Sequence, residues 1–301
     1  MKLKSVLKNL AIVLVVITAS NTLAQDGFQG QAIYMSKTTI DMDNFGGREM
    51  SPERKKMIME RMKSMLEKTY ILDFNKTESI YKEDEALEAP GGPGGFRMGG
   101  MSAGPVYKNV KENRLVQDQE FFGKQFLIKD SLPTLEWKMS GESKQIGKYT
   151  CFKATAIKKV DAADWTNMRR RDRNKEKKEG EETETTEVEK DSTKTDAPKD
   201  PFEEIEIPKE IEVTAWYTMD IPVNNGPGEY WGLPGLILEV NSGRTTILCS
   251  KIVMNPSDKN DIDEPTKGKE VSMEEYQETV KKKMEEMREM FRSRRGGGRR
   301  N

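Results

Sequence analysis

The sequence predicts a mainly β protein with a few helices, in which a curved antiparallel sheet or open half-barrel carries one helix on its concave side. Two observations support this fold class. Short segments rich in β-branched and aromatic residues recur between turn residues along most of the chain. Only two segments place apolar residues at helical spacing, and the second of these predicts an additional C-terminal helix. Such a series of short strands is typical of an antiparallel meander.

The first elements are predicted from local signals. Residues 31–40 contain β-branched and aromatic residues, so they are expected to form a strand. Ser51 is a suitable N-cap and Pro52 a suitable first residue for a helix that ends near residue 68. The apolar face of this helix is formed by Ile58, Met62, Met65 and Leu66.

The remaining strands follow the same pattern, interrupted by two long loops. Strands are predicted at residues 70–75, 79–81, 106–110, 114–119, 125–129, 135–139, 149–157, 211–219, 236–241 and 245–254. Residues 89–105 are rich in Gly and Pro and are expected to form a flexible loop. Residues 166–205 contain a long charged run that lacks apolar residues to bury, so we expect a second flexible loop there.

The C-terminal helix has a clear start signal. Ser272 and Glu275 have the spacing of a capping box. The residues that follow place one narrow apolar stripe on the helix, formed by Tyr276, Val280, Met284, Met287 and Phe291. The last ten residues are basic and are expected to fray. The predicted organisation is therefore a signal peptide at residues 1–24, one β domain at 25–262, and the C-terminal helix with a basic tail at 263–301.

The first 24 residues have the three parts of a cleavable secretory signal peptide. Three lysines precede a short apolar run, and small residues end it at Ala24. We therefore expect cleavage between Ala24 and Gln25 and a mature protein in the periplasm or outside the cell. No other stretch is long and apolar enough to be a transmembrane segment.

Composition excludes several classes of function. The chain of 301 residues contains no His, so Ser-His-Asp triads, Cys-His pairs and imidazole zinc sites are excluded, and an enzyme is the less favoured reading. The formal net charge is −1, and loss of the three signal-peptide lysines would bring it near −4. A dedicated nucleic-acid binder would carry a basic excess, so no nucleic-acid partner is predicted. Nothing in the sequence implies a cofactor.

The two cysteines, Cys151 and Cys249, form a candidate disulfide because an oxidising compartment permits one. The alternative is two buried thiols on separate strands, and sequence alone does not choose between them.

One segment is unusually rich in Gly, Pro and aromatic residues. Between Ala215 and Leu238 the chain reads AWYTMDIPVNNGPGEYWGLPGLIL. Its prolines restrict φ and its glycines permit close backbone approach, so it predicts a rigid irregular loop that enters a strand. Such a loop either plugs one end of the sheet or forms the mouth of a ligand site. The candidate binding residues are Trp216, Tyr217, Gly226, Pro227, Tyr230, Trp231, Gly232, Leu233, Pro234, Gly235, Leu236 and Ile237.

On these residues the chain resembles the GLPGLI family of exported bacterial proteins, which is named after the run that stands here at residues 232–237. Similar upstream features are Phe126 to Asp130, Trp137-Lys138 and Tyr149 to Ala154, and the resemblance covers most of residues 28–255. The resemblance implies a β-rich envelope or secreted protein without an established activity. It also implies a setting near outer-membrane transport, with a TonB-dependent receptor as the possible partner.

Three hypotheses about function follow. The first is a non-enzymatic binding or accessory protein that holds a hydrophobic ligand or a protein partner at the concave face. The second is a carboxylate-based hydrolase that uses Asp220 and Glu229 as an acid/base pair. The third is soft-metal binding, with Cu(I) held by methionine clusters on the two helices. These clusters are Met57, Met59, Met62 and Met65, and Met284, Met287 and Met290.

Overall fold

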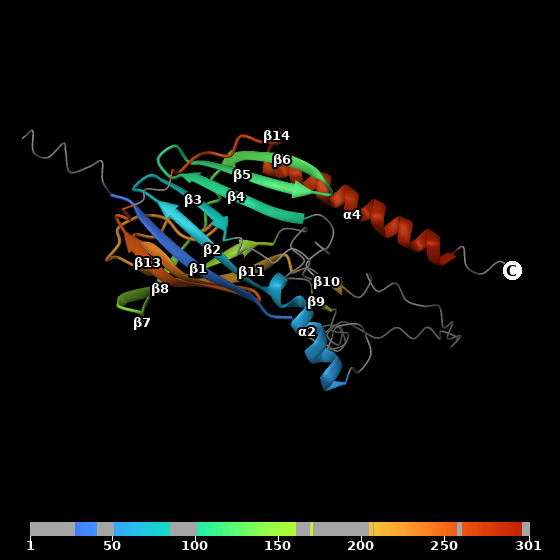
Figure 1. Ribbon diagram of the computed structural model, residues 1–301, viewed down its shortest axis with the longest axis horizontal. Coiled ribbons are helices and arrows are strands. Elements are labelled where there is room, and N and C mark those ends of the chain that lie inside the picture. The colour runs from blue at the N-terminus through green and yellow to red at the C-terminus, as the bar shows by residue number, and fades with distance from the viewer. Residues whose placement is uncertain are drawn as a thin grey trace, which may run out of the picture.

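The computed structural model describes residues 28–40, 51–84, 101–160, 169–170, 205–206, 208–257 and 261–296 (Figure 1). The predicted signal peptide, most of the predicted loop at 89–105 and nearly all of that at 166–205 therefore lie outside the described residues. The two helices of the described chain are α2 (Pro52–Leu66) and α4 (Met273–Gly296).

A single curved sheet of 12 strands dominates the described structure. Its order is β14-β6-β5-β4-β3-β2-β1-β13-β12-β11-β8-β7, and it does not close into a barrel. The β14 strand pairs with β6 in parallel, and the other neighbours in this sheet pair antiparallel. The strands are β1 (Gly30–Thr38), β2 (Glu67–Phe74), β3 (Glu78–Glu83), β4 (Met101–Asn109), β5 (Arg114–Phe121), β6 (Lys124–Ser131), β7 (Lys138–Ile146), β8 (Tyr149–Lys159), β11 (Glu210–Thr218), β12 (Leu236–Ser242), β13 (Thr245–Met254) and β14 (Lys269–Val271). A separate two-stranded ribbon joins β9 (Arg169–Arg170) to β10 (Ile205–Glu206).

The fold class is confirmed as mainly β with an open, predominantly antiparallel sheet. Local alternation located most strands well, because one side of each strand packs against the core while the other is more exposed. In β11, for example, Ile211, Val213, Ala215 and Tyr217 are buried, and the intervening residues are less so.

The prediction was wrong at the start of β4. Residues 101–105 were expected to belong to the Gly/Pro-rich loop, but they form the first half of a strand. The pairing of β4 with β5 shifts register between Ala103 and Val106, so Gly104 and Pro105 lie at an irregularity of the ladder. A proline is tolerated at such a place because its missing N–H leaves no ladder bond unmade.

The β7 strand begins and ends later than predicted, at residues 138 and 146 rather than 135 and 139. It lies at one edge of the sheet and is mostly polar and exposed, so it lacks the apolar alternation on which the prediction relied. The short β14 strand was not predicted at all.

The helix at residues 52–66 forms where predicted, and Ser51 accepts a hydrogen bond from the Arg54 N–H at its N-terminus. Its predicted position on the concave side of the sheet is not confirmed. Most of its described side chains are exposed, including Met57 and Met59, while Leu66 at its end is buried. Figure 1 shows α2 beyond the ends of β1 and β2.

The cysteine bridge that the sequence permits is not present, because Cys151 and Cys249 are both free and buried. They lie on β8 and β13, which are separated in the sheet by β11 and β12. Both belong to one apolar cluster, and each thiol contacts a nearby backbone carbonyl, at Tyr149 and Lys251 respectively. Burial raises the pKa of Cys151 to about 11 and that of Cys249 to about 12.

Candidate functional site

The segment between β11 and β12, residues 219–235, is here called the motif loop. Its side chains alternate in exposure even though it is not a strand: Ile221, Val223 and Asn225 are buried, whereas Pro222 and Asn224 are exposed. Its own backbone is bonded to β12, since the Leu236 N–H donates to the Ile221 carbonyl and the Ile237 N–H to the Asn225 carbonyl. The loop therefore has one fixed inner side and one outer side that faces solvent.

The glycines of the motif run permit a backbone that other residues would not allow. A Cβ atom at Gly235 would lie 2.0 Å from the Thr218 carbonyl oxygen, so the chain turns back against the end of β11 at this point. Gly232 has φ of +90°, a left-handed conformation that L side chains rarely adopt. These two residues explain why the loop needs glycine where the GLPGLI run has it.

A buried lysine on β4 holds the inner side of the loop. Lys108 Nζ donates to the carbonyl oxygens of Gly226 at 2.7 Å and Tyr230 at 3.1 Å, and the lysine is fully buried. Burial lowers the pKa of Lys108 to about 7, and the nearby Glu229 carboxylate opposes this shift only in part. The ammonium group thus replaces its lost hydration with two loop carbonyls.

Two further strands contribute hydrogen bonds to the loop and to the strand that it enters. The Ser79 hydroxyl on β3 bonds the Asn225 side-chain oxygen at 2.9 Å. The Tyr34 hydroxyl on β1 donates to the carbonyl of Ile237 on β12 at 2.7 Å, and burial raises the pKa of this tyrosine well above its ordinary value. Because β3 and β4 both reach a loop that follows β11, the sheet must curl around the loop, and the loop occupies its concave interior.

Hydrogen bonds from two tryptophan indole rings connect the C-terminal part of the motif loop to the segment before β7. The Trp137 indole N–H donates to the Trp231 carbonyl at 2.9 Å, and the Trp231 indole N–H donates to the Pro133 carbonyl at 2.6 Å. The buried Leu233 belongs to a cluster that also contains Tyr217, Tyr230 and Ile237, with Trp137 packed against it. These aromatic residues cover the loop rather than line an open cleft.

The predicted candidate residues are therefore brought together, but mostly as core. Tyr217, Gly226, Pro227, Tyr230, Leu233, Gly235, Leu236 and Ile237 are buried, Trp216 and Trp231 are half-buried, and Gly232 and Pro234 are exposed. Trp216 lies under the Lys144 ammonium, which is 4.2 Å from the ring centre and pairs with Glu239 at 2.7 Å. Of the two proposed roles, the structure favours the plug over the ligand mouth.

Sequence reasoning missed Lys108 and Ser79 as partners of the loop and Tyr34 as a partner of β12. A signal for Lys108 was present, because the period of two in a strand places it on the same side as Val106 and Val110. A lysine between two inward-facing valines is unusual for a solvated face. Ser79 lies directly opposite Lys108 in the β3–β4 pair, which sequence periodicity does not reveal.

The two carboxylates of the hydrolase hypothesis have different surroundings. Glu229 forms an ion pair with Lys158, which also lies 5.9 Å from the centre of the Tyr230 ring. Asp220 is exposed, and its N–H donates to the Thr218 hydroxyl at 3.3 Å. Glu229 is thus engaged in a structural contact at the loop, and the hydrolase reading gains no support from its position.

The described residues contain no group of three or more Cys, Asp or Glu side chains that could hold a metal ion. The absence of such a group does not test the methionine hypothesis for Cu(I), because methionine is not one of these residue types. Met57 and Met59 are two residues apart on α2, so they point to different sides of the helix. Met284 and Met287 have a spacing of three on α4 and can share a face.

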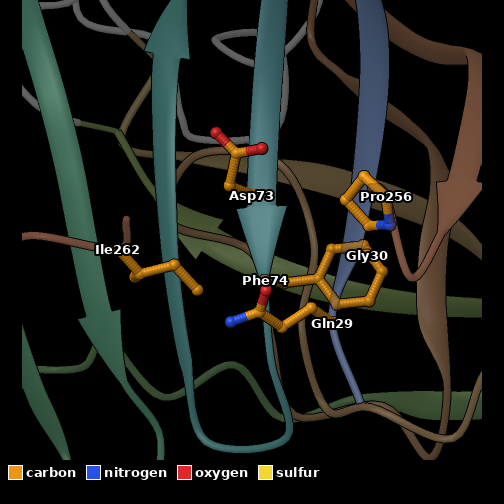
Figure 2. A pocket seen from close by; sticks show the side chains of 6 residues that line it. All are labelled: Gln29, Gly30, Asp73, Phe74, Pro256 and Ile262. Carbon is orange, nitrogen blue, oxygen red and sulfur yellow. The ribbon is translucent and has the colours of Figure 1, made fainter. Parts of the chain in front are cut away.

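One small hollow lies at the end of β1 and β2 (Figure 2). Its cavity volume is about 10 Å³, and its lining comprises Gln29, Gly30, Asp73, Phe74, Pro256 and Ile262. Asp73 is nearly fully buried there, and it pairs with Lys82 at 3.3 Å and accepts a hydrogen bond from Gln31 at 2.9 Å. Ligand pockets usually exceed about 300 Å³, so this hollow is too small for a drug-sized ligand.

Comparison with known families gives one match. A family model described as a protein of unknown function (Porph_ging) matches residues 137–239. This is about a third of the chain, from just before β7 into β12, and it includes the whole motif loop. The match supports a resemblance to a family of unknown function, and its description does not carry the GLPGLI name.

Other comparisons are less informative. No curated protein matches the chain. Two solved structures of PNGF-II, from two crystal forms, are similar over 84% of this chain with 13% identity and a TM-score of 0.44. The chain spans only 32% and 33% of those two solved chains. A similarity at this level supports no functional argument.

Neither helix of the described chain combines the length and the apolar character that a membrane-spanning helix requires.

Proposed function

We propose that this chain is an exported, non-enzymatic binding or accessory protein of the bacterial envelope, and that the outer side of the motif loop contacts a protein partner. Export would follow cleavage between Ala24 and Gln25. The proposal rests on the difference between the two sides of the loop: hydrogen bonds hold the inner side in place, whereas the outer side is exposed. Lys108 and Ser79 hold the inner side, while Pro222, Asn224 and Pro234 face solvent.

A surface of this kind is suited to binding because its order is established before the partner arrives. Association normally costs free energy when loops become ordered, and a loop that is already held in one conformation avoids most of that cost. Functional contacts are also common on loops that a rigid scaffold positions. The half-buried Trp231 next to the exposed Gly232 adds an aromatic edge to this surface.

A protein partner fits the structure better than a hydrophobic ligand in the concave interior. That interior is occupied by side chains of the loop itself, among them Ile221, Val223 and Leu233. A ligand there would have to displace these side chains and break the two carbonyl contacts of Lys108. The resemblance to the GLPGLI family makes an outer-membrane TonB-dependent receptor the first partner to test.

The experiment is site-specific photo-cross-linking in living cells. A photoreactive amino acid at Asn224, which is exposed on the outer side of the loop, should give a defined adduct with one envelope protein. The control places the same group at the exposed Glu142 on β7, distant in sequence from the loop. We expect an adduct from position 224 alone, which mass spectrometry would identify.

Adducts of equal yield at both positions, or none at either, would count against a partner at this surface. Export is checked separately, because N-terminal sequencing of the protein from the envelope fraction should begin at Gln25. An intact N-terminus at Met1 in a cytoplasmic fraction would refute the export part of the proposal.

A further inference from the structure

The helix α2 is joined to the sheet at its C-terminal end. It ends at Leu66 and β2 begins at Glu67, so no residue separates the two elements. Leu66 is buried, and the Glu67 carboxylate pairs with Lys37 at 3.1 Å and with Lys63 at 4.0 Å. Figure 1 shows the helix projecting beyond the ends of β1 and β2. The direct junction with β2 therefore fixes the direction of a helix that extends away from the strands.

Charged residues recur at intervals of seven along this helix. The recurring pairs are Glu53 and Glu60, Arg54 and Arg61, and Lys56 and Lys63. Residues seven apart lie on nearly the same side of an α-helix, because the drift is only about 20° per seven residues. At about 100° per residue, the arginine pair lies along one border of the apolar side and the lysine pair along the other. The glutamate pair lies on the opposite side of the helix.

The helix carries a charge opposite to that of the rest of the protein. It contains five basic and two acidic residues, a net charge of +3, so the remainder of the chain carries −4. Arg54, Lys56 and Arg61 are exposed, and no ion pair among the described residues neutralises them. The described side chains of α2 thus present positive charge that a negatively charged partner would complement.

The apolar side between the two basic borders is partly accessible. Met59 is 38% exposed there, and Ile58 and Met62 are half-buried. Lys55 shares this side, and its long aliphatic chain can lie along apolar atoms while the ammonium group reaches outward. An apolar side bordered by basic residues, with acidic residues opposite, suits a helix that lies in the surface of a membrane. Two seven-residue repeats are fewer than the three or four that indicate a coiled coil.

We propose that α2 attaches this protein to a membrane surface that contains anionic phospholipids, with its apolar side toward the bilayer and its basic borders among the headgroups. A projecting helix can reach a flat surface without bringing the sheet against it. The remainder of the chain is repelled by the surface that attracts the helix, so the charge distribution also orients the molecule. Each basic residue near an anionic bilayer adds to the attraction. This inference does not depend on the partner of the motif loop.

The test is flotation of the full chain with lipid vesicles. Vesicles of phosphatidylglycerol and phosphatidylethanolamine in equal parts should bind the protein at low salt, whereas vesicles of phosphatidylcholine should not. Binding should be lost near 1 M salt, where the Debye length falls to about 3 Å. A helix variant should bind at least tenfold more weakly. This variant combines Arg54→Gln, Lys56→Gln and Arg61→Gln.

A matched control removes the same amount of charge from exposed turns at the end of the sheet opposite to α2. Its binding should stay within about twofold of the parent, because the changed residues are far from the helix. Circular dichroism would establish that both variants fold. The control combines Lys76→Gln, Lys111→Gln and Lys148→Gln.

A second pair of variants tests which side of the helix meets the bilayer. Met59→Ser changes the apolar side and should weaken binding about twofold or more. Met57→Ser removes a side chain that is 53% exposed but lies away from the apolar side, so binding should be unchanged. Equal effects of these two substitutions would contradict the proposed orientation.

Other outcomes would overturn the proposal as a whole. These are binding that is independent of phosphatidylglycerol, and an equal loss in the turn control, which would show that only total charge matters. Tighter binding to a DNA duplex or to polyglutamate than to the vesicles would assign the helix to another polyanion. Oligomers in light scattering that the helix variant abolishes, without vesicle binding, would assign it to a second copy of the chain.

Discussion

Lys108 Nζ lies 2.7 Å from the carbonyl oxygen of Gly226, and this contact joins the C-terminal end of β4 to the loop that follows β11. The two residues are 118 positions apart in the chain. The lysine lies in an apolar interior, so its charged form is retained at a cost that the two loop carbonyls offset in part. This relationship makes the packing of the motif loop sensitive to the protonation of one side chain.

The first prediction concerns pH. The pKa of Lys108 is lowered from 10.5 to about 7 in the folded protein. Above about pH 7 the folded chain therefore releases a proton that the unfolded chain keeps, so the free energy of unfolding should rise with pH. The rise from pH 7 to 8 should be roughly 1 kcal/mol, measured by urea denaturation. The window ends there because the thiols of the unfolded chain, whose ordinary pKa is about 8.5, ionise substantially above pH 8 and act in the opposite direction.

Replacement of the lysine provides the control for this effect. In a Lys108→Met variant the rise between these pH values should disappear, whereas Lys138→Met, at an exposed position on β7, should retain it. An identical pH dependence in the parent and in Lys108→Met would show that Lys108 does not titrate in this range.

The second prediction compares two buried tyrosines. Tyr34→Phe removes the hydrogen bond to the Ile237 carbonyl and should lower the free energy of unfolding by roughly 1 to 3 kcal/mol. The Tyr81 hydroxyl is buried and has no hydrogen-bond partner in the described part of the chain. Tyr81→Phe should therefore be neutral or stabilising by up to about 1 kcal/mol. Chemical denaturation followed by tryptophan fluorescence measures both, and an equal loss in the two variants would contradict this assignment.

The third prediction concerns the glycine at the end of the motif loop. A Gly235→Ala methyl group would overlap the Thr218 backbone carbonyl, which is not a flexible side-chain end and cannot move aside easily. We expect a loss of about 3 kcal/mol or more in stability. Gly141→Ala is the matched control, because nothing lies within 4 Å of the added atom. If the two variants have equal stability in thermal denaturation, the close approach of the loop to β11 is incorrect.

The fourth prediction concerns the cysteines. Both thiols are free and buried, with pKa values raised by burial to about 11 and 12, so very little thiolate exists near pH 8. A disulfide reagent such as dithiobis(nitrobenzoate) should react slowly with the folded protein and rapidly with both thiols after unfolding in guanidinium. Protein purified from the envelope that releases thiols only after treatment with a reductant would instead contain the bridge.

Local patterns predicted much of this fold because most strands have one buried side and because the caps of the helices use short-range bonds. Ser51 and the pair Ser272 and Glu275 act as the sequence indicated. The same reasoning failed where a strand lacks alternation, as in the polar edge strand β7, or where it contains Gly and Pro, as in the first half of β4. It also located the irregular loop that enters β12, because proline fixes φ and glycine permits conformations that other residues avoid.

The sequence by itself determined the β-rich class, the start of both helices, the absence of imidazole chemistry and the position of the irregular motif loop. The tertiary structure decided what the loop does. Only the curvature of the sheet brings Lys108 and Ser79 to the inner side of the loop, and only the strand order places two strands between Cys151 and Cys249. The physical reason is that periodicity and capping are properties of neighbouring residues. The pairing of distant strands depends instead on contacts between residues more than a hundred positions apart, such as Lys108 and Gly226.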